Sequence, residues 1–214
     1  SWRLDSSEDW RDRSARTVAM IGSGRLALTA LEPAVAIRPI EPILVYSSNA
    51  ERRQSFARKA SQELKIPVQA VDSPEKAGAQ GDFVLVSTNS PAAALRGEWL
   101  RPGLAVFGIG RPNEFEDEVY LRANFVCITS KAHELGYYDA KLDQPLLRLS
   151  QSGALAWRAV AEFADVISGR IKPPDNSGRI VFRDSQGGYG DLALAAEAYE
   201  EARRRGLGQE IDIE

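Results

Sequence analysis

The chain has 214 residues, of which 43% are hydrophobic and 27% are charged, and its formal net charge is −3. This size predicts one full domain with a smaller appended part, because a domain commonly holds about 150 residues. The weakly acidic balance provides no field that would attract nucleic acid or an anionic membrane, so small molecules and other proteins are the expected partners.

From residue 17 onward, short apolar runs alternate with stretches that have helical spacing, which is typical of a parallel sheet covered by helices. Strands are expected at residues 17–21, 43–46, 68–71, 83–87, 104–108 and 125–129. Helices are expected at residues 25–36, 50–64 and 116–123, and after the capping residue Ser73. Six strands predict an α/β fold with a doubly wound, mostly parallel Rossmann sheet flanked by helices.

Beyond residue 150 this alternation stops. A helical stretch is expected at residues 155–166, followed by a Pro- and Gly-rich stretch at 169–178, an apolar run at 179–182 and a glycine-rich stretch at 185–190. A last helix at residues 191–205 is expected to end at Gly206, because glycine suits a helix C-cap. These features predict a C-terminal helical appendage beside the sheet.

A glycine-rich loop joins the first expected strand to the first expected helix. In the dinucleotide fingerprint the first glycine turns the chain and the second lets the backbone approach a pyrophosphate, and here these are Gly22 and Gly24. Ala27 replaces the third glycine and still allows the helix to pack closely, with its positive end toward the phosphates. The expected pyrophosphate contacts are Gly22, Ser23, Gly24, Arg25, Leu26 and Ala27.

The end of the second strand is where a Rossmann domain binds the adenosine ribose. NAD-selective domains carry an acid there, about twenty residues past the loop. This sequence carries Ser47, Ser48 and Asn49 instead, with Arg52 beyond, and these four are the expected contacts. No acid would repel a 2′-phosphate, and hydroxyl, amide and guanidinium groups can hold one, so NADP is favoured over NAD. For at least one of Arg52 and Arg53, a solvated helix face is the alternative.

The ends of the fourth and fifth strands are expected to line the nicotinamide, because ligands of such sheets bind at the carboxyl ends of the strands. The residues there are Thr88, Asn89, Ser90, Gly108 and Gly110. Ordinary strand-ending turns are the alternative. Arg111 follows directly and is a weak catalytic candidate, since it could orient a substrate carboxylate.

Two further groups bear on chemistry and setting. His133 has no neighbouring Cys or His in the sequence, so no metal site is predicted, and it is a minor candidate for a catalytic acid. Cys127 lies in an apolar run, which predicts a buried thiol and a reducing, cytoplasmic setting. No apolar stretch approaches the roughly 18 residues of a membrane-spanning helix, so no membrane contact is expected.

With these elements in place, the chain resembles the ornithine cyclodeaminase and mu-crystallin family from about residue 17 to about residue 208. The resemblance is carried by residues 18–27, 88–90, 97–106, 108–113 with Glu116, 167–170, 182–191 and 206–208. It implies a Rossmann domain bound to NAD(H) or NADP(H), with hydride transfer to or from the carbon that bears nitrogen. The implied substrates are amino acids, cyclic imines or 2-oxo acids.

Two features differ from the family pattern. Cyclodeaminases place a catalytic aspartate just after the fifth strand, whereas Gly110 here runs into Arg111, and neither Glu116 nor Asp117 takes the matching position. Family members also carry a substrate and dimerisation domain ahead of the Rossmann domain. We therefore expect residues 1–16 to be a remnant of that domain, residues 17–150 to form the NAD(P)-binding domain, and residues 151–214 to complete the substrate and dimerisation region.

Three functions are compatible with this sequence. The first is an NAD(P)-dependent oxidoreductase acting by hydride transfer on an amino acid, a cyclic imine or a 2-oxo acid. The second is a non-catalytic nucleotide-binding or interaction module, and the third is an ornithine cyclodeaminase that forms proline. Half of a crevice left exposed would favour association, so a homo-oligomer or a complex with another chain is expected.

Overall fold

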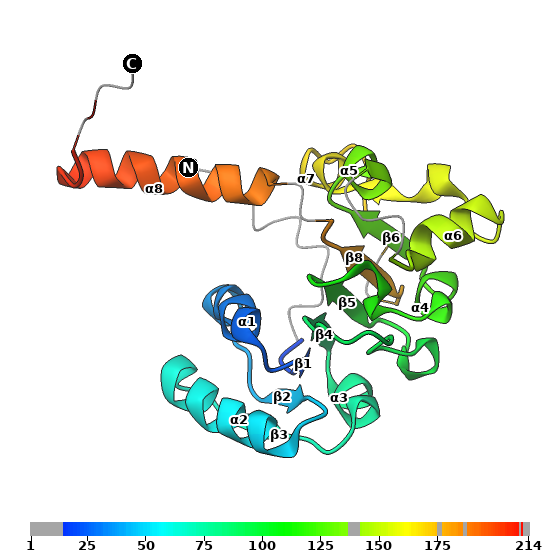
Figure 1. Ribbon diagram of the computed structural model, residues 1–214, viewed down its shortest axis with the longest axis horizontal. Coiled ribbons are helices and arrows are strands. Elements are labelled where there is room, and N and C mark those ends of the chain that lie inside the picture. Colours follow the sequence, from blue (N-terminus) through cyan, green and yellow to red (C-terminus); the bar gives the residue numbers. More distant parts are fainter. Residues whose placement is uncertain (1–14, 137–141, 175–176, 186–187, 210, 212–214) are drawn as a thin grey trace.

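A computed structural model describes residues 15–136, 142–174, 177–185, 188–209 and 211 (Figure 1). Most of the N-terminal segment 1–16 and part of the glycine-rich stretch 185–190 lie outside these residues. The strands are β1 (Val18–Ile21), β2 (Ile43–Tyr46), β3 (Val68–Ala70), β4 (Phe83–Val86), β5 (Ala105–Gly108), β6 (Phe125–Ile128), β7 (Ala161–Glu162) and β8 (Ile180–Arg183). The α-helices are α1 (Arg25–Ile37), α2 (Ala50–Leu64), α3 (Pro74–Gln80), α4 (Asp117–Leu121), α5 (Lys131–Gly136), α6 (Pro145–Gln151), α7 (Phe163–Ile167) and α8 (Tyr189–Arg205). Short 3₁₀ helices are η2 (Gly97–Trp99), η3 (Pro112–Glu114) and η4 (Trp157–Ala159).

The strands form a parallel sheet in the order β3-β2-β1-β4-β5-β8-β6-β7. The order runs outward from β1 in both directions, because β1 pairs with β2 on one side and with β4 on the other. In Figure 1, α1 and α2 lie on one side of the sheet, and α3, α4 and α6 lie on the other. The predicted doubly wound parallel sheet is therefore confirmed.

The predicted strand count and one predicted helix are wrong. Over the described residues the sheet has eight strands rather than six, because β8 lies between β5 and β6 and β7 lies at the edge. The helix predicted at residues 155–166 is divided into η4, β7 and α7. Pairing of β7 with β6 satisfies backbone groups at the sheet edge, and this long-range pairing overrides the helical spacing. The division into domains remains a prediction, although β7 and β8 share the sheet with the strands before residue 150.

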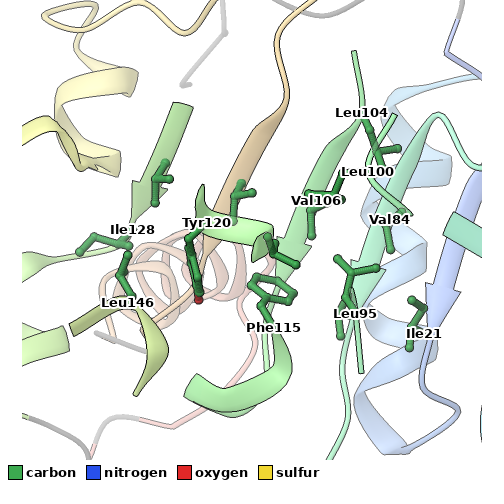
Figure 2. Close-up of a cluster of buried hydrophobic side chains, with 14 of the residues drawn as sticks. Ile21, Val84, Leu95, Leu100, Leu104, Val106, Phe115, Tyr120, Ile128 and Leu146 are labelled. Carbon is green, nitrogen blue, oxygen red and sulfur yellow. The ribbon is translucent and has the colours of Figure 1, made fainter. Parts of the chain in front are cut away.

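Alternate residues of the strands build an apolar layer on each side of the sheet. In β1, Val18 and Met20 join the cluster that includes α1 and α2, whereas Ala19 and Ile21 join the cluster that includes α3, α4 and α6. Figure 2 shows the second cluster, which continues through Phe115. Because β1 is buried on both sides, it contributes to a site through the loop that follows its carboxyl end.

The last helix, α8, stands away from the sheet (Figure 1). It ends at Gly206, whose φ of 66° is left-handed, as expected of a C-cap glycine. On this helix Leu192, Leu194 and Tyr199 are 71%, 71% and 60% exposed. The predicted C-terminal helical appendage is therefore confirmed for α8, whereas β7 and β8, which were expected in the same appendage, belong to the main sheet. Leu192 and Tyr199, seven residues apart, lie on one face of α8.

Candidate functional site

The loop after β1 is held between the ends of β2 and β4. The amide of Gly22 donates to the carbonyl of Tyr46, the last residue of β2, at 2.8 Å. On the other side, a Cβ on Gly22 would lie 2.0 Å from the carbonyl oxygen of Ser87, which follows β4. Gly22 also has a φ of 119°, which L side chains rarely adopt. Glycine is therefore required at this turn by conformation and by the close approach of the backbone.

The N-terminus of α1 is open. Gly24 is its N-cap residue, no described side chain caps the helix, and its first turn holds no acidic residue. A Cβ on Gly24 would meet no atom of the described residues within 4 Å. Ala27 is fully buried, which lets α1 pack closely on the sheet. The helix N–H groups and the positive end of the helix dipole therefore face an open space that suits a negatively charged group.

The residues predicted to bind the adenosine ribose lie together at the end of β2. Ser23 Oγ donates to Ser47 Oγ at 2.9 Å, which links the glycine loop to this end of β2. Asn49 is the N-cap residue of α2, and its Oδ1 accepts from the Arg52 amide at 2.8 Å. Asn49 therefore shapes the turn that presents its neighbours.

The two arginines on the first turn of α2 differ in their surroundings. Arg53 Nη1 donates to the carbonyl of Ser47 at 2.8 Å, and its guanidinium carbon lies 5.6 Å from the centroid of the Tyr46 ring. Arg53 therefore supports the end of β2. Arg52 and Ser48 are exposed to solvent.

A buried carboxylate connects the ends of β4 and β5. Glu114 Oε1 accepts from the Thr88 amide at 2.5 Å, and Oε2 accepts from the Gly110 amide at 2.8 Å. Glu114 is 2% exposed. A Cβ on Gly110 would lie 2.5 Å from Glu114 Oε1, so the carboxylate needs glycine at this position. Burial raises the pKa of Glu114 to about 7, although the two amides, the charge of Arg183 and the Thr88 side chain lower it.

A buried ion pair lies at the carboxyl end of β8. Arg183, the last residue of β8, is in register with Gly108 of β5 and Ile128 of β6. Its Nε lies 3.1 Å from Oε1 of Glu134 in α5, and the two side chains are 2% and 0% exposed. Burial raises the pKa of Glu134, and the neighbouring guanidinium lowers it. Because arginine stays protonated, the buried Arg183 guanidinium carries a positive charge at the carboxyl end of β8, next to the ends of β5 and β6.

The other residues predicted for the nicotinamide end lie around the same edge. Thr88 Oγ1 accepts from the Ser90 amide at 3.2 Å, which shapes the turn after β4. Gly108 ends β5 in register with the last residue of β4. Asn89 and Arg111 are exposed, and Arg111 directly precedes η3.

The sequence reasoning missed Glu114 and the pair formed by Arg183 and Glu134. The partners of the Glu114 carboxylate are backbone amides, which no side-chain motif reveals. The one available signal was an acid beside the apolar Phe115, close after a predicted strand. The position of Arg183 follows only from the placement of β8 between β5 and β6.

Cys127 and His133 are the remaining groups singled out in the sequence. Cys127 is buried, as predicted, and burial raises the pKa of its thiol to about 12. His133 lies in α5, and its backbone amide donates to Ser130 Oγ at 3.3 Å. Within the described residues, no group of three or more His, Cys, Asp or Glu side chains is placed to hold a metal ion. In the same part of the chain, no helix has both the length and the apolar character needed to cross a membrane.

The strand order, with the glycine turn after the central strand β1, defines a Rossmann-type α/β fold, in which ligands bind at the carboxyl ends of the strands. The model of the ornithine cyclodeaminase/mu-crystallin family matches residues 10–206. The chain therefore belongs to the ornithine cyclodeaminase/mu-crystallin family, as its sequence resemblance predicted.

Relatives share sequence across most of the chain. The chain is 27% identical over 206 residues to a Delta(1)-pyrroline-2-carboxylate reductase of Bacillus cereus, a match that covers 94% of this chain and 62% of the relative. It is 24% identical over 206 residues to the iminosuccinate reductase of Paracoccus denitrificans, with 94% and 61% covered. The chain thus spans less than two thirds of the length of these relatives.

Solved structures share the fold. The Delta(1)-pyrroline-2-carboxylate reductase of Thermococcus litoralis, in complex with NADH and L-proline, has a TM-score of 0.81 at 24% identity, with 94% of this chain and 62% of that chain covered. The iminosuccinate reductase of Paracoccus denitrificans, in complex with NAD⁺, has a TM-score of 0.81 at 21% identity, with 95% and 62% covered.

Proposed function

We propose that this chain is the nucleotide-binding part of an NAD(P)-dependent oxidoreductase that reduces the C=N bond of an imine or oxidises the corresponding amino acid. The open N-terminus of α1, beside the tight turn at Gly22, carries this proposal, because it suits a pyrophosphate. The relatives named as pyrroline-2-carboxylate and iminosuccinate reductases support the substrate class, a carboxylate next to a C=N bond. We expect the rest of the substrate site to be formed by a region that corresponds to the part of these relatives outside the match.

The dinucleotide would lie along the carboxyl ends of β2, β1, β4 and β5. The proposed pyrophosphate contacts are Gly22, Ser23, Gly24, Arg25, Leu26 and Ala27. The proposed adenosine contacts are Ser47, Ser48, Asn49 and Arg52. The proposed nicotinamide contacts are Thr88, Asn89, Ser90, Gly108 and Gly110. The bound nucleotide supplies the hydride chemistry, and these residues bind and orient it.

The end of β5 favours a reductase over an ornithine cyclodeaminase. Gly110 leads into Arg111, whose exposed guanidinium suits the carboxylate of a substrate rather than proton removal. The carboxyl of Glu114 is buried, and both of its oxygens accept backbone amides, so it is not placed to take a proton from a substrate. Hydride transfer to a protonated imine needs no acidic side chain at this position, whereas the family's cyclodeaminases use an aspartate there.

This function is tested with the full-length protein. Oxidation of NADPH and of NADH is followed by absorbance with Delta(1)-pyrroline-2-carboxylate and with iminosuccinate, and ornithine is assayed for release of ammonia and proline. We expect nucleotide oxidation with one of the imines and no reaction with ornithine. Binding of nucleotide without turnover would instead support a non-catalytic binding module, and release of ammonia and proline would support a cyclodeaminase.

The proposed preference for NADP makes a prediction at Arg52. The Arg52→Ala variant is expected to raise the dissociation constant of NADPH about tenfold, because a charge-assisted hydrogen bond to the 2′-phosphate is lost. The dissociation constant of NADH should change little, because NADH lacks that phosphate. The measurement is a fluorescence titration of each reduced nucleotide, with Arg58→Ala, an exposed arginine on the same helix, as the control. Equal weakening for both nucleotides would contradict a role in binding the 2′-phosphate.

We also propose that the exposed apolar surface of α8 is a contact between chains, in a homo-oligomer or in a complex with another chain. Exposed apolar surfaces favour association in water, and Leu192 and Tyr199, which are seven residues apart, lie on the same face of this helix. Light scattering on the full-length protein tests the proposal, and a monodisperse monomer would contradict it. The cytoplasmic setting expected from Cys127 stays a prediction.

A further inference from the structure

The Glu114 carboxylate touches both backbone segments that are proposed to line the nicotinamide. One oxygen accepts from the Thr88 amide after β4, and the other accepts from the Gly110 amide after β5. The carboxylate therefore links the two segments just beyond the last residues through which β4 and β5 pair directly.

Glu114 is itself firmly anchored. Its carbonyl accepts from the amides of Ala94 at 2.8 Å and Leu95 at 3.2 Å. Asn113 Nδ2 donates to the carbonyl of Pro91 at 2.8 Å, so η3 is fixed to the segment that follows β4. A side chain held this rigidly can impose a geometry on its two partners rather than follow them.

We propose that Glu114 is a positioning residue, whose ionised carboxylate holds the Thr88 and Gly110 segments at the separation that the nicotinamide end of a bound dinucleotide requires. This inference rests on the proposed function, because it assumes that the nucleotide lies along these segments. Glu114 would act through the two backbone segments and would not touch the reacting atoms.

The count of donors and acceptors explains why the charge state matters. Two carboxylate oxygens match two N–H donors, whereas a protonated acid offers one acceptor and turns its own O–H donor toward the second amide. One buried amide then lacks an acceptor, which is costly away from water. The same mismatch arises with glutamine, so Glu114→Gln has the hydrogen-bonding capacity of the protonated state.

Charged groups around Glu114 lie on β8, α5, α4 and α6, and Arg111 directly precedes η3. From β8, Arg183 favours the ionised form of the carboxyl, and Glu134 of α5 pairs with that arginine. Asp117 of α4 and Arg148 of α6 pair with each other. Burial is the largest influence and raises the pKa to about 7, so the carboxyl changes its charge near neutral pH. We therefore expect nucleotide affinity to fall as the pH falls through about 7.

Folding has the opposite dependence on pH. The ordinary pKa of this carboxyl is 4.5 and its folded pKa is about 7, so the folded state holds a proton that the unfolded state has lost between these values. The contribution of Glu114 to the free energy of unfolding therefore declines as the pH rises through this window. At the lower pH this carboxyl contributes more to the free energy of unfolding, not less. A loss of nucleotide affinity at the lower pH therefore cannot be explained by this carboxyl destabilising the fold.

The test measures the dissociation constant of NADPH by fluorescence, for the full-length wild-type protein and for Glu114→Gln, between about pH 6 and about pH 8. Near pH 8 we expect the variant to bind NADPH about tenfold more weakly than the wild type. Near pH 6 the dissociation constants of the two proteins should converge. Glu118→Gln on α4, whose side chain is 56% exposed, is the control and should follow the wild-type curve. A constant ratio of the two dissociation constants at every pH would overturn the proposal.

A second readout needs no nucleotide. In wild-type protein the backbone amide resonances of Thr88 and Gly110 should shift with a midpoint near pH 7, and in Glu114→Gln they should not. Absence of this titration in the wild type would overturn the proposal even if the variant failed to fold. If the amides titrate but the wild type binds neither NADPH nor NADH at any pH, the proposed function fails and the positioning role fails with it, while the carboxylate bridge stands.

Discussion

The Gly22→Ala variant is expected to unfold at a much lower urea concentration than the wild type. Its Cβ would lie 2.0 Å from the carbonyl oxygen of Ser87, so the backbone at the end of β4 must move. Its φ of 119° is also strained for any L side chain. Together these effects should lower the free energy of unfolding by about 3 kcal/mol or more.

Gly24→Ala is the matched control for this prediction. Gly24 lies two residues further along the same loop, has a φ of −80° and has open space where a Cβ would be. Its free energy of unfolding should stay within about 1 kcal/mol of the wild type. If Gly22→Ala were as stable as Gly24→Ala, the close packing of the loop between β2 and β4 would be wrong.

The second large effect is expected at the buried pair of Arg183 and Glu134. Glu134→Gln removes the carboxylate that lies 3.1 Å from the guanidinium, and both side chains are almost fully buried. Removing one partner of a buried ion pair commonly costs about 3–5 kcal/mol, so the free energy of unfolding should fall by that amount. Urea unfolding followed by circular dichroism measures it.

An exposed ion pair on the same protein provides the comparison. Arg148 contacts Asp117 with side chains that are 51% and 35% exposed, so Asp117→Asn should cost about 1 kcal/mol or less. A double variant, Arg183→Met with Glu134→Leu, should regain much of the lost stability, because an apolar pair leaves no buried charge. A loss in Glu134→Gln no larger than in Asp117→Asn would show that the buried charge finds compensation elsewhere.

Much of the fold is predictable because its signals are local. The helix predicted at residues 50–64 matches α2, and Ser73 caps α3 by accepting from the Lys76 amide. The order of the strands is not local. An apolar run at residues 179–182 looks the same at the edge of a sheet as between β5 and β6, so only the assembled sheet reveals the place of β8.

The candidate site likewise has a part that local sequence predicts and a part that depends on the order of the strands. The glycine loop is readable because the turn, the helix start and the close backbone approach all fall within residues 22–27. Glu114 and Arg183 are not readable, because their surroundings depend on which strand ends become neighbours. Gly110 illustrates the difference, since it was predicted to contact the nucleotide, whereas the structure shows that Glu114 also requires glycine there.

Binding of a dinucleotide at the open N-terminus of α1 is tested most directly by calorimetric titration of NADPH and NADH. We predict saturable binding at one site per chain in the full-length wild-type protein. In Gly24→Ala, whose fold should be intact, the added Cβ would occupy the space above the helix end and binding should weaken markedly. Absence of binding in the wild type, or equal affinity in the two proteins, would contradict binding at this helix end.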